Sequence, residues 1–370
     1  MRIERIELFL LRLPLKRPYE TSGSVETHQT RVIARIESEG VVGWGESVAP
    51  ERPWYSGETP ETIWWLLDEI AIPQLLKSDL PDPYATNATL DWIRDHRMAK
   101  ATLEMGIWDL FAKRANAPLS ALLGGTRDRI LCGVAIGIQP TVEQLLERIR
   151  TELDATAYQR VKVKIKPGWD GHIAEMIRNT FPDLPFQLDA NSAYTLADIP
   201  LFKRIDAYTP LLVEQPLAED DIIDHATLQK AIMTPVCLDE SIHTAEDARK
   251  AIQIGATRVI NIKAGRVGGL AEAKRIHDVC EEHEVPVWCG GMLEMGIGRA
   301  ANVHLASLPN FRLPGDVSAS SRYFDTEIIG EPFTVEKDGT MKVPRGPGIG
   351  VTVLEDVIRK LALKTKEYRP

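Results

Sequence analysis

The chain has 370 residues, of which 44% are hydrophobic and 26% are charged, and this composition is that of an ordinary globular protein large enough for a barrel with an additional domain. Its formal net charge of −9 argues against a nucleic-acid partner and against binding to an anionic membrane surface. No apolar run approaches the roughly 20 residues that span a bilayer, and residues 1–18 do not resemble a secretory signal. The four cysteines form no C-x-x-C pair. For these reasons we expect a cytoplasmic protein.

The first 125 residues predict an α+β capping domain. Residues 1–44 alternate apolar and polar side chains as strands do, with Glu39-Gly40 as the turn of a hairpin. Residues 19–29 and 49–60 are irregular and polar, and we expect them to form lids that exclude water. Residues 62–122 carry apolar side chains at helical spacing.

After Gly124-Gly125, short apolar runs alternate with amphipathic helical runs, an order that demands parallel strands. This alternation predicts an α/β fold, a (β/α)7-8 TIM-like barrel over residues 126–320, in which the last strand is weak. Residues 321–370 are expected to return to the capping domain. The expected strands are 130–138, 160–166, 186–191, 211–216, 236–241, 258–265, 285–291 and 311–316.

Charged residues recur along the barrel at a fixed period. Lys164, Asp189, Glu214 and Asp239 are 25 residues apart, and Lys263 follows 24 residues later. A period of this size indicates repeating supersecondary units. Each of the five residues lies at the carboxyl end of an expected strand, on the face opposite the aliphatic side chains. In a barrel these faces point inward, so the five charges should meet at its mouth.

The run VKVKIK (161–166) places three lysines on one face of a strand. Taken alone, it could equally be a solvated edge strand, because lysine often protects sheet edges. The barrel favours the other interpretation, in which Lys162 and Lys164 line the interior and Lys166 lies above the rim.

Three neighbouring carboxylates, Asp189, Glu214 and Asp239, repel one another and require a cation. An Mg²⁺ ion fits best, because it prefers oxygen ligands and keeps positions open for substrate, although Mn²⁺ or another divalent ion could substitute. The alternative is that the acids are helix N-caps, which explains one site better than three in register. Lys164 and Lys263 flank the acids and could exchange a proton on opposite faces of a substrate carbon next to a carboxylate. Either lysine could instead be a structural ion-pair partner.

Several stretches resemble the enolase superfamily, in its muconate-lactonizing-enzyme subgroup, over essentially the whole chain. In amino-acid sequence these stretches are most similar to the o-succinylbenzoate synthase and N-succinylamino acid racemase family. The resemblance implies that Asp189, Glu214 and Asp239 bind Mg²⁺ and that Lys164 and Lys263 are the acid/base pair. The stretches are KIKPGWD (164–170), LDANSAYTL (188–196), CLDESI (237–242), NIKAGRVGG (261–269), PVWCGGMLEMGIGRA (286–300) and LPGDVSAS (313–320).

The same resemblance supplies candidate substrate contacts. Arg266 could tune Lys263 or be a solvated loop residue, and Gly291 and Met292 could offer backbone donors. Ala135 departs from the serine of relatives, which weakens the assignment of acyl-side hydrogen bonds. The candidates are Lys162, Asn191, Arg266, Gly291, Met292, Asp316, Ser318, Tyr55, Ser22 and Gly23.

The resemblance implies proton abstraction next to a carboxylate through an enediolate, with dehydration to o-succinylbenzoate in menaquinone biosynthesis and racemisation of N-acylamino acids. We also expect a small carboxylate substrate and a homo-oligomer. One alternative is a racemase or dipeptide epimerase as the main activity, although the Asp-x-Asp typical of the epimerases is absent at Asp316. The others are a Schiff-base aldolase using Lys263, a non-catalytic binding barrel, and a zinc hydrolase, which lacks its histidine motifs here.

Overall fold

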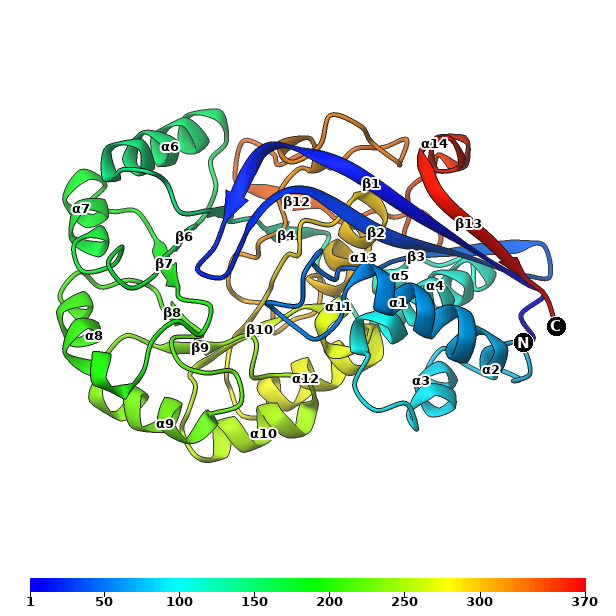
Figure 1. Ribbon diagram of the computed structural model, residues 1–370, viewed down its shortest axis with the longest axis horizontal. Coiled ribbons are helices and arrows are strands. Elements are labelled where there is room, and N and C mark those ends of the chain that lie inside the picture. The colour runs from blue at the N-terminus through cyan, green and yellow to red at the C-terminus, as the bar shows by residue number, and fades with distance from the viewer.

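Alternating side chains at the N-terminus build a four-stranded antiparallel sheet in the computed structural model, which describes residues 1–370. Its strands are β1 (Arg5–Glu20), β2 (Val25–Ser38), β3 (Val41–Glu46) and β13 (Ala362–Tyr368), in the order β13-β1-β2-β3. The predicted turn joins β2 to β3, where Glu39 and Gly40 have φ of 51° and 75°. The tip of the long β1–β2 hairpin reaches toward the barrel (Figure 1).

Helices cover one face of this sheet and complete the cap. The central helix α4 (Arg97–Arg114) packs directly against β3, and only glycine allows this approach: a Cβ on Gly45 would lie 1.9 Å from the carbonyl oxygen of Thr102. The other cap helices are α1 (Pro60–Leu66), the π-helix η1 (Leu67–Ala71), α2 (Ile72–Leu75), α3 (Ala85–Leu90) and α5 (Leu119–Leu123).

Seven parallel strands form the barrel sheet, in the order β11-β10-β9-β8-β7-β6-β5. They are β5 (Val134–Ile136), β6 (Val161–Lys164), β7 (Phe186–Asp189), β8 (Val213–Glu214), β9 (Val236–Leu238), β10 (Val259–Ile262) and β11 (Val287–Cys289). The eighth expected strand, 311–316, makes only isolated bridges, Val287 to Phe311 and Cys132 to Gly315, so it spans the gap between β11 and β5 without forming a ladder.

The connecting helices form an outer ring around these strands, most visibly from α6 to α10 (Figure 1). They are α6 (Val142–Ala155), α7 (Ile173–Thr180), α8 (Ile199–Asp206) after the 3₁₀ turn η2 (Leu196–Asp198), α9 (Ile222–Ala231), α10 (Ala245–Gln253), α11 (Ala264–Val267), α12 (Leu270–Glu282) and α13 (Gly296–Leu305). No helix combines the length and the apolar character needed to cross a membrane.

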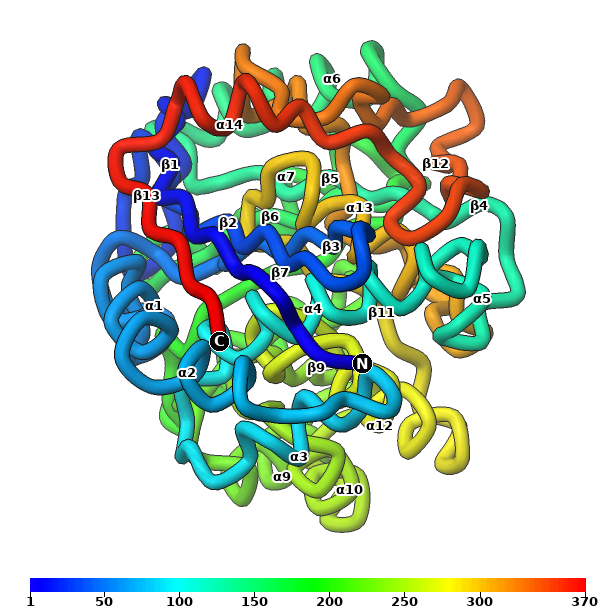
Figure 2. Tube along the Cα trace, turned by 90° about the vertical axis from the view of Figure 1, so that its right-hand side faces the viewer, coloured from blue at the N-terminus to red at the C-terminus, as the bar shows by residue number.

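The C-terminal segment touches both parts of the molecule. After the 3₁₀ turn η3 (Ser320–Arg322), β12 (Thr340–Lys342) pairs with β4 (Arg129–Leu131), a short strand that precedes β5. Helix α14 (Glu355–Leu361) then leads into β13, which runs antiparallel to β1 along the cap (Figure 2).

Side-chain alternation along the barrel strands follows the expected parity. On β6, Val161 and Val163 are fully buried in the main hydrophobic core beneath the helices, and Ile165, just beyond the strand, belongs to the same core. Lys162 and Lys164 point the other way, into a cavity at the barrel mouth. The fold therefore turns the charged faces of β6 to β10 toward one site under the cap.

Candidate active site

Five charged side chains stand at the carboxyl ends of neighbouring strands. Lys164, Asp189 and Glu214 are the last residues of β6, β7 and β8, and Asp239 and Lys263 come directly after β9 and β10. The parallel register places Lys164 beside Asp189 and Asp189 beside Glu214. The three carboxylates are fully buried, and the two lysines nearly so. The 25-residue spacing thus does gather these charges at one mouth of the barrel.

Ion pairs join the lysines to the carboxylates. Lys164 Nζ lies 2.6 Å from Asp189 Oδ2, and Lys263 Nζ lies 2.7 Å from Asp239 Oδ2. Lys162 Nζ is 3.1 Å from both Asp189 Oδ2 and Glu214 Oε2. Burial alone would raise the pKa of Asp189, but Lys164 and Lys162 outweigh it and hold the pKa below its usual range. Asp189 is therefore a charged carboxylate at neutral pH.

The chemistry of the acid cluster fits a divalent cation. Burial, followed by the charge of Asp189, raises the pKa of Glu214 to about 7, although Lys162 Nζ lies 3.1 Å from its Oε2. Two of its hydrogen-bond donors are the neutral amides of Gln187 and Asn261. Glu240, next to Asp239, is also buried, and its Oε2 has no hydrogen-bond partner. Buried carboxylate oxygens are the hard donors that Mg²⁺ prefers.

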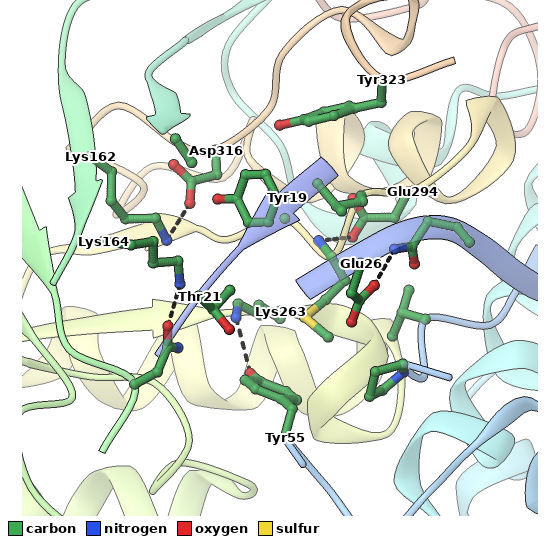
Figure 3. Close-up of a pocket in the computed structure, with 18 of the residues that line it drawn as sticks. Tyr19, Thr21, Glu26, Tyr55, Lys162, Lys164, Lys263, Glu294, Asp316 and Tyr323 are labelled. Carbon is green, nitrogen blue, oxygen red and sulfur yellow. Dashed lines mark hydrogen bonds and ion pairs between the residues drawn. The ribbon is translucent and has the colours of Figure 1, made fainter. Parts of the chain in front are cut away.

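The catalytic candidates Lys164 and Lys263 line one cavity, with Lys162 beside them (Figure 3). Lys164 comes from β6 and Lys263 from the end of β10, so the three acid-bearing strands lie between them. Lys164 Nζ also donates to Asn191 Oδ1 at 2.6 Å, which fixes the direction of the amine. The two amines therefore approach the same space from different sides of the acid cluster.

Tyr55 of the cap completes the surroundings of Lys263. Lys263 Nζ donates to the Tyr55 hydroxyl at 3.0 Å, and that hydroxyl donates to Asp239 Oδ1 at 3.0 Å. The amine also lies 4.6 Å from the centre of the tyrosine ring. Burial lowers the pKa of Lys263, but Tyr55 and Glu240 outweigh it and raise the pKa above its ordinary value. The cap thus holds Lys263 in place as a cation.

Lys162 is held from below by a second buried group. One carboxylate oxygen of Asp316, Oδ2, pairs with Lys162 Nζ, and the other, Oδ1, lies 2.7 Å from a guanidinium nitrogen of Arg160. Both cations lie 4.9 Å from the ring centre of Trp288. Burial lowers the pKa of Lys162, but Asp316, Glu214 and Asp189 outweigh it and raise the pKa well above its usual value. Lys162 is therefore a fixed cation at the floor of the cavity.

We expect Asp316→Asn to weaken substrate binding and stability together. It removes the anion between Lys162 and Arg160, and breaking a buried ion pair costs about 3–5 kcal/mol. Because Lys162 would no longer be fixed by Asp316, KM for a carboxylate substrate should rise by about tenfold. The experiment measures KM and, separately, the midpoint of thermal unfolding. Asp325→Asn is the control, because the side chain of Asp325 is 86% exposed. An Asp316 variant with unchanged KM and unchanged midpoint contradicts this role.

The predicted substrate contacts fall into two groups. Lys162, Asn191, Gly291, Met292, Asp316 and Tyr55 line the cavity, whereas Ser22, Gly23, Arg266 and Ser318 do not. Two of the cavity residues have their polar groups already engaged: Asp316 by the two cations, and the Met292 backbone N–H by Glu294 Oε1 at 2.9 Å. Ser318 is buried, and its hydroxyl has no hydrogen-bond partner.

Arg266 reaches the acid cluster from behind. Its guanidinium contacts Asp239 Oδ1 and donates to the backbone oxygens of Ile242 at 3.0 Å and Asn261 at 2.8 Å. It shares the carboxylate of Asp239 with Lys263, and its charge also acts on Tyr55, which contacts Lys263.

Residues 19–29, predicted to be irregular, are instead the ends of β1 and β2 with a turn between them, because Tyr19 and Glu20 pair with Glu26 and Val25. This hairpin tip and the irregular segment 49–60 lie over the cavity. Ser22 Oγ donates to the Asn191 carbonyl at 3.4 Å, and Lys166, outside the cavity, pairs with Glu20 at 2.9 Å. Gly23 lies against the face of Trp54, where an added Cβ would come within 2.6 Å of the ring. The two segments therefore support each other above the lysines.

Sequence reasoning missed several cavity residues. They are mostly polar or aromatic side chains of the cap, of the chain after β11 and of the C-terminal segment, namely Thr21, Glu26, Gln29, Arg31, Val48, Pro50, Trp54, Leu293, Glu294, Arg299 and Tyr323. The clearest available signal was Trp54-Tyr55, an aromatic pair in an otherwise polar irregular segment. The charges on β2 gave no such signal, because polar residues are normal in a half-exposed strand.

A further acidic group, formed by His277, Asp278 and Glu281, lies on α12 away from the cavity. Its histidine is already engaged, since Nε2 accepts the Asn310 N–H at 2.9 Å and Nδ1 lies 2.9 Å from Asp278 Oδ1. This group is therefore a structural contact and is separate from the site at the barrel mouth.

Comparison with known proteins agrees with this arrangement. Residues 5–124 match the model of the mandelate racemase/muconate lactonizing enzyme N-terminal domain, and residues 144–357 match the enolase C-terminal domain-like model. The chain is 51% identical to an o-succinylbenzoate synthase of Geobacillus kaustophilus, over 95% of this chain and 93% of the relative. It is 47% identical to an N-succinylamino acid racemase of Thermus thermophilus, over 98% of both. An enolase-superfamily crystal structure from Listeria innocua superposes with a TM-score of 0.96 at 39% identity, covering 100% of this chain and 99% of that one.

Proposed function

Since the chain belongs to the mandelate racemase/muconate lactonizing enzyme family of the enolase superfamily, we propose that it is an o-succinylbenzoate synthase that also racemises N-succinylamino acids. Both reactions begin with the loss of a proton next to a carboxylate. The proposal rests above all on the placement of Lys164 and Lys263, which enter one cavity from the two sides of a buried acid cluster.

In the racemase reaction, Lys164 Nζ removes the α-proton from one face of the substrate carbon, and Lys263 Nζ delivers a proton to the other face. The roles reverse for the opposite enantiomer. In the synthase reaction, Lys164 takes the proton and then assists loss of hydroxide, while Lys263 stays a cation beside the intermediate. The raised pKa of Lys263 supports that cationic role, and the 2.6 Å contact with Asn191 supports the fixed direction of Lys164.

Asp189, Glu214 and Asp239 would hold the Mg²⁺ ion. When bound, the ion supplies positive charge that stabilises the negative charge developing on the substrate carboxylate, and it lowers the pKa of the nearby lysine amines. Lys162 would contact the same carboxylate, and its raised pKa keeps it charged for that purpose. Tyr55 and the lid segments exclude water from the amines.

The surroundings of Asp316 disfavour a dipeptide epimerase. Such an enzyme needs free carboxylates for a peptide amine, whereas both oxygens of Asp316 are engaged by Lys162 and Arg160. The position two residues later is Ser318, which supplies no second acid. We further propose a cytoplasmic homo-oligomer. The four free, buried cysteines support its cytoplasmic location, because such thiols suit a reducing compartment.

The test compares kcat/KM on the cyclohexadiene carboxylate that dehydrates to o-succinylbenzoate with kcat/KM on N-succinyl-L-phenylalanine. Exchange of the α-proton in D₂O is followed by NMR in the same samples. We expect turnover of both substrates and exchange of deuterium into the amino acid derivative. Absence of turnover and of exchange with both substrates, in Mg²⁺-loaded protein, contradicts the proposed function.

A further inference from the structure

The substrate cavity differs in charge between its two ends. Beyond Ala135 and Tyr323 it adjoins a second cavity, with which it shares these two residues and Tyr19. Three arginines, Arg17, Arg148 and Arg322, line that second cavity. Arg148 and Arg322 both pair with Glu152, and Glu20 pairs with Lys166, whereas the Arg17 side chain makes no ion pair. Arg17 is therefore the cation that an anionic group at this end, such as the distal carboxylate of a succinyl chain, would meet.

The other end of the cavity presents a carboxylate, Glu26 of β2 (Figure 3). Glu26 Oε1 accepts from Trp54 Nε1 at 3.3 Å, and Oε2 accepts from the Gln29 amide. Both donors are neutral, and no lysine, arginine or histidine nitrogen lies within 4.0 Å of Glu26. These contacts fix the direction of the carboxylate without neutralising its charge.

The remaining charges at this end are sealed inside the protein. Arg31 and Arg299 are each 1% exposed and Glu294 is 4% exposed, whereas Glu26 is only half-buried. Arg31 donates to the carbonyl oxygens of Ala49 at 2.7 Å and Met292 at 2.6 Å, so its terminal N–H groups face protein rather than ligand. Glu26 is therefore the charge that an occupant of this end would meet.

Apolar surface leads to this carboxylate. Val48, Pro50 and the Trp54 ring line the cavity on the same cap segments. Such a wall suits the aliphatic stem of a long side chain, whose terminal group would then reach Glu26.

We propose that this end is the side-chain subsite and that it selects N-acylamino acids with a basic side chain, which pairs with Glu26. The preferred substrate is then anionic at its acyl end and cationic at its side-chain end. The inference rests on the proposed racemase function, because it assigns the two ends of that cavity to the two substituents of the α-carbon.

The test uses an isosteric pair, N-succinyl-L-arginine and N-succinyl-L-citrulline, which differ in charge but hardly in shape. We expect the wild-type enzyme to favour the arginine derivative in kcat/KM by about five- to tenfold, which is reasonable for a half-exposed ion pair. In Glu26→Gln the ratio should fall to about one, and in Glu26→Asp, which keeps the charge, it should stay above that of the glutamine variant. Glu51→Gln is the matched control, since Glu51 lies on the cap outside the cavity lining and should leave the ratio unchanged.

A second measurement needs no variant. Because Glu26 is half-exposed, raising the NaCl concentration from 0.05 to about 0.5 M should screen the pair and lower the wild-type ratio. Equal efficiency on both derivatives in wild-type protein, or a ratio that Glu26→Gln leaves intact, overturns the inference. Loss of all activity on both derivatives, in protein that holds Mg²⁺, would instead reject the proposed function.

Discussion

Replacing Lys164 with alanine should abolish both the synthase and the racemase reaction, because one amine starts both. A positioned acid or base contributes about 10²–10⁴ to the rate, so we expect kcat to fall by about 10³ or more. Alanine removes the only amine that enters the cavity from β6 with its direction fixed by Asn191. The rate of product formation and the exchange of the α-proton in D₂O should fall together.

Two further variants distinguish the role of Lys164 as a base from its role as a positive charge. Lys164→Arg keeps a cation beside Asp189, but a guanidinium stays protonated and cannot accept the α-proton, so this variant should be folded and equally inactive. Lys166→Ala is the matched control on the same run of lysines. Its amine pairs with Glu20 outside the cavity at 2.9 Å, and we expect a change of less than about threefold. Retained synthase turnover in Lys164→Ala contradicts the assignment of the base.

The spacing of the charges along the chain predicted the centre of this site well, for a simple physical reason. A (β/α) repeat returns the chain to the same level of the barrel at each strand, so residues 25 apart, such as Asp189 and Glu214, end side by side. Strand parity then separated Lys162 and Lys164, which face the cavity, from Ile165, which packs in the core.

The periphery of the site could not be predicted in the same way. Tyr55 meets Lys263 across 208 residues of sequence, through the docking of the cap on the barrel, and no local pattern encodes that contact. Asp316 was expected to face substrate, yet Arg160 and Lys162 engage both of its oxygens, an arrangement set by three-dimensional packing. The stretch 311–316 resembled a strand because apolar alternation does not reveal how many ladder partners a strand finds.

The largest effect besides that of Lys164→Ala should come from removing the metal. Chelation is expected to abolish both reactions, and addition of Mg²⁺ or Mn²⁺ should restore them. Without the ion, burial and the charge of Asp189 raise the pKa of Glu214 to about 7 despite Lys162 at 3.1 Å, and Oε2 of Glu240 has no hydrogen-bond partner. Without the ion, no cation would stabilise the negative charge that develops on the substrate carboxylate, and Lys263, whose pKa is raised in this setting, would stay protonated.

Binding of the ion can be measured without turnover. This measurement distinguishes a variant that is inactive because it does not bind the metal from one that is inactive because it lacks the base. An ion at about 100 times its Kd should stabilise the folded protein by about 2.7 kcal/mol, seen as a higher midpoint of thermal unfolding in Mg²⁺ than in chelator. Glu214→Gln keeps the shape of the side chain and one oxygen, which can still accept from either Gln187 or Asn261, but it should lose this stabilisation. Lys164→Arg should keep it while remaining inactive. Full activity in protein freed of metal, or an equal Mg²⁺-dependent shift in Glu214→Gln, would show that these carboxylates do not hold the ion.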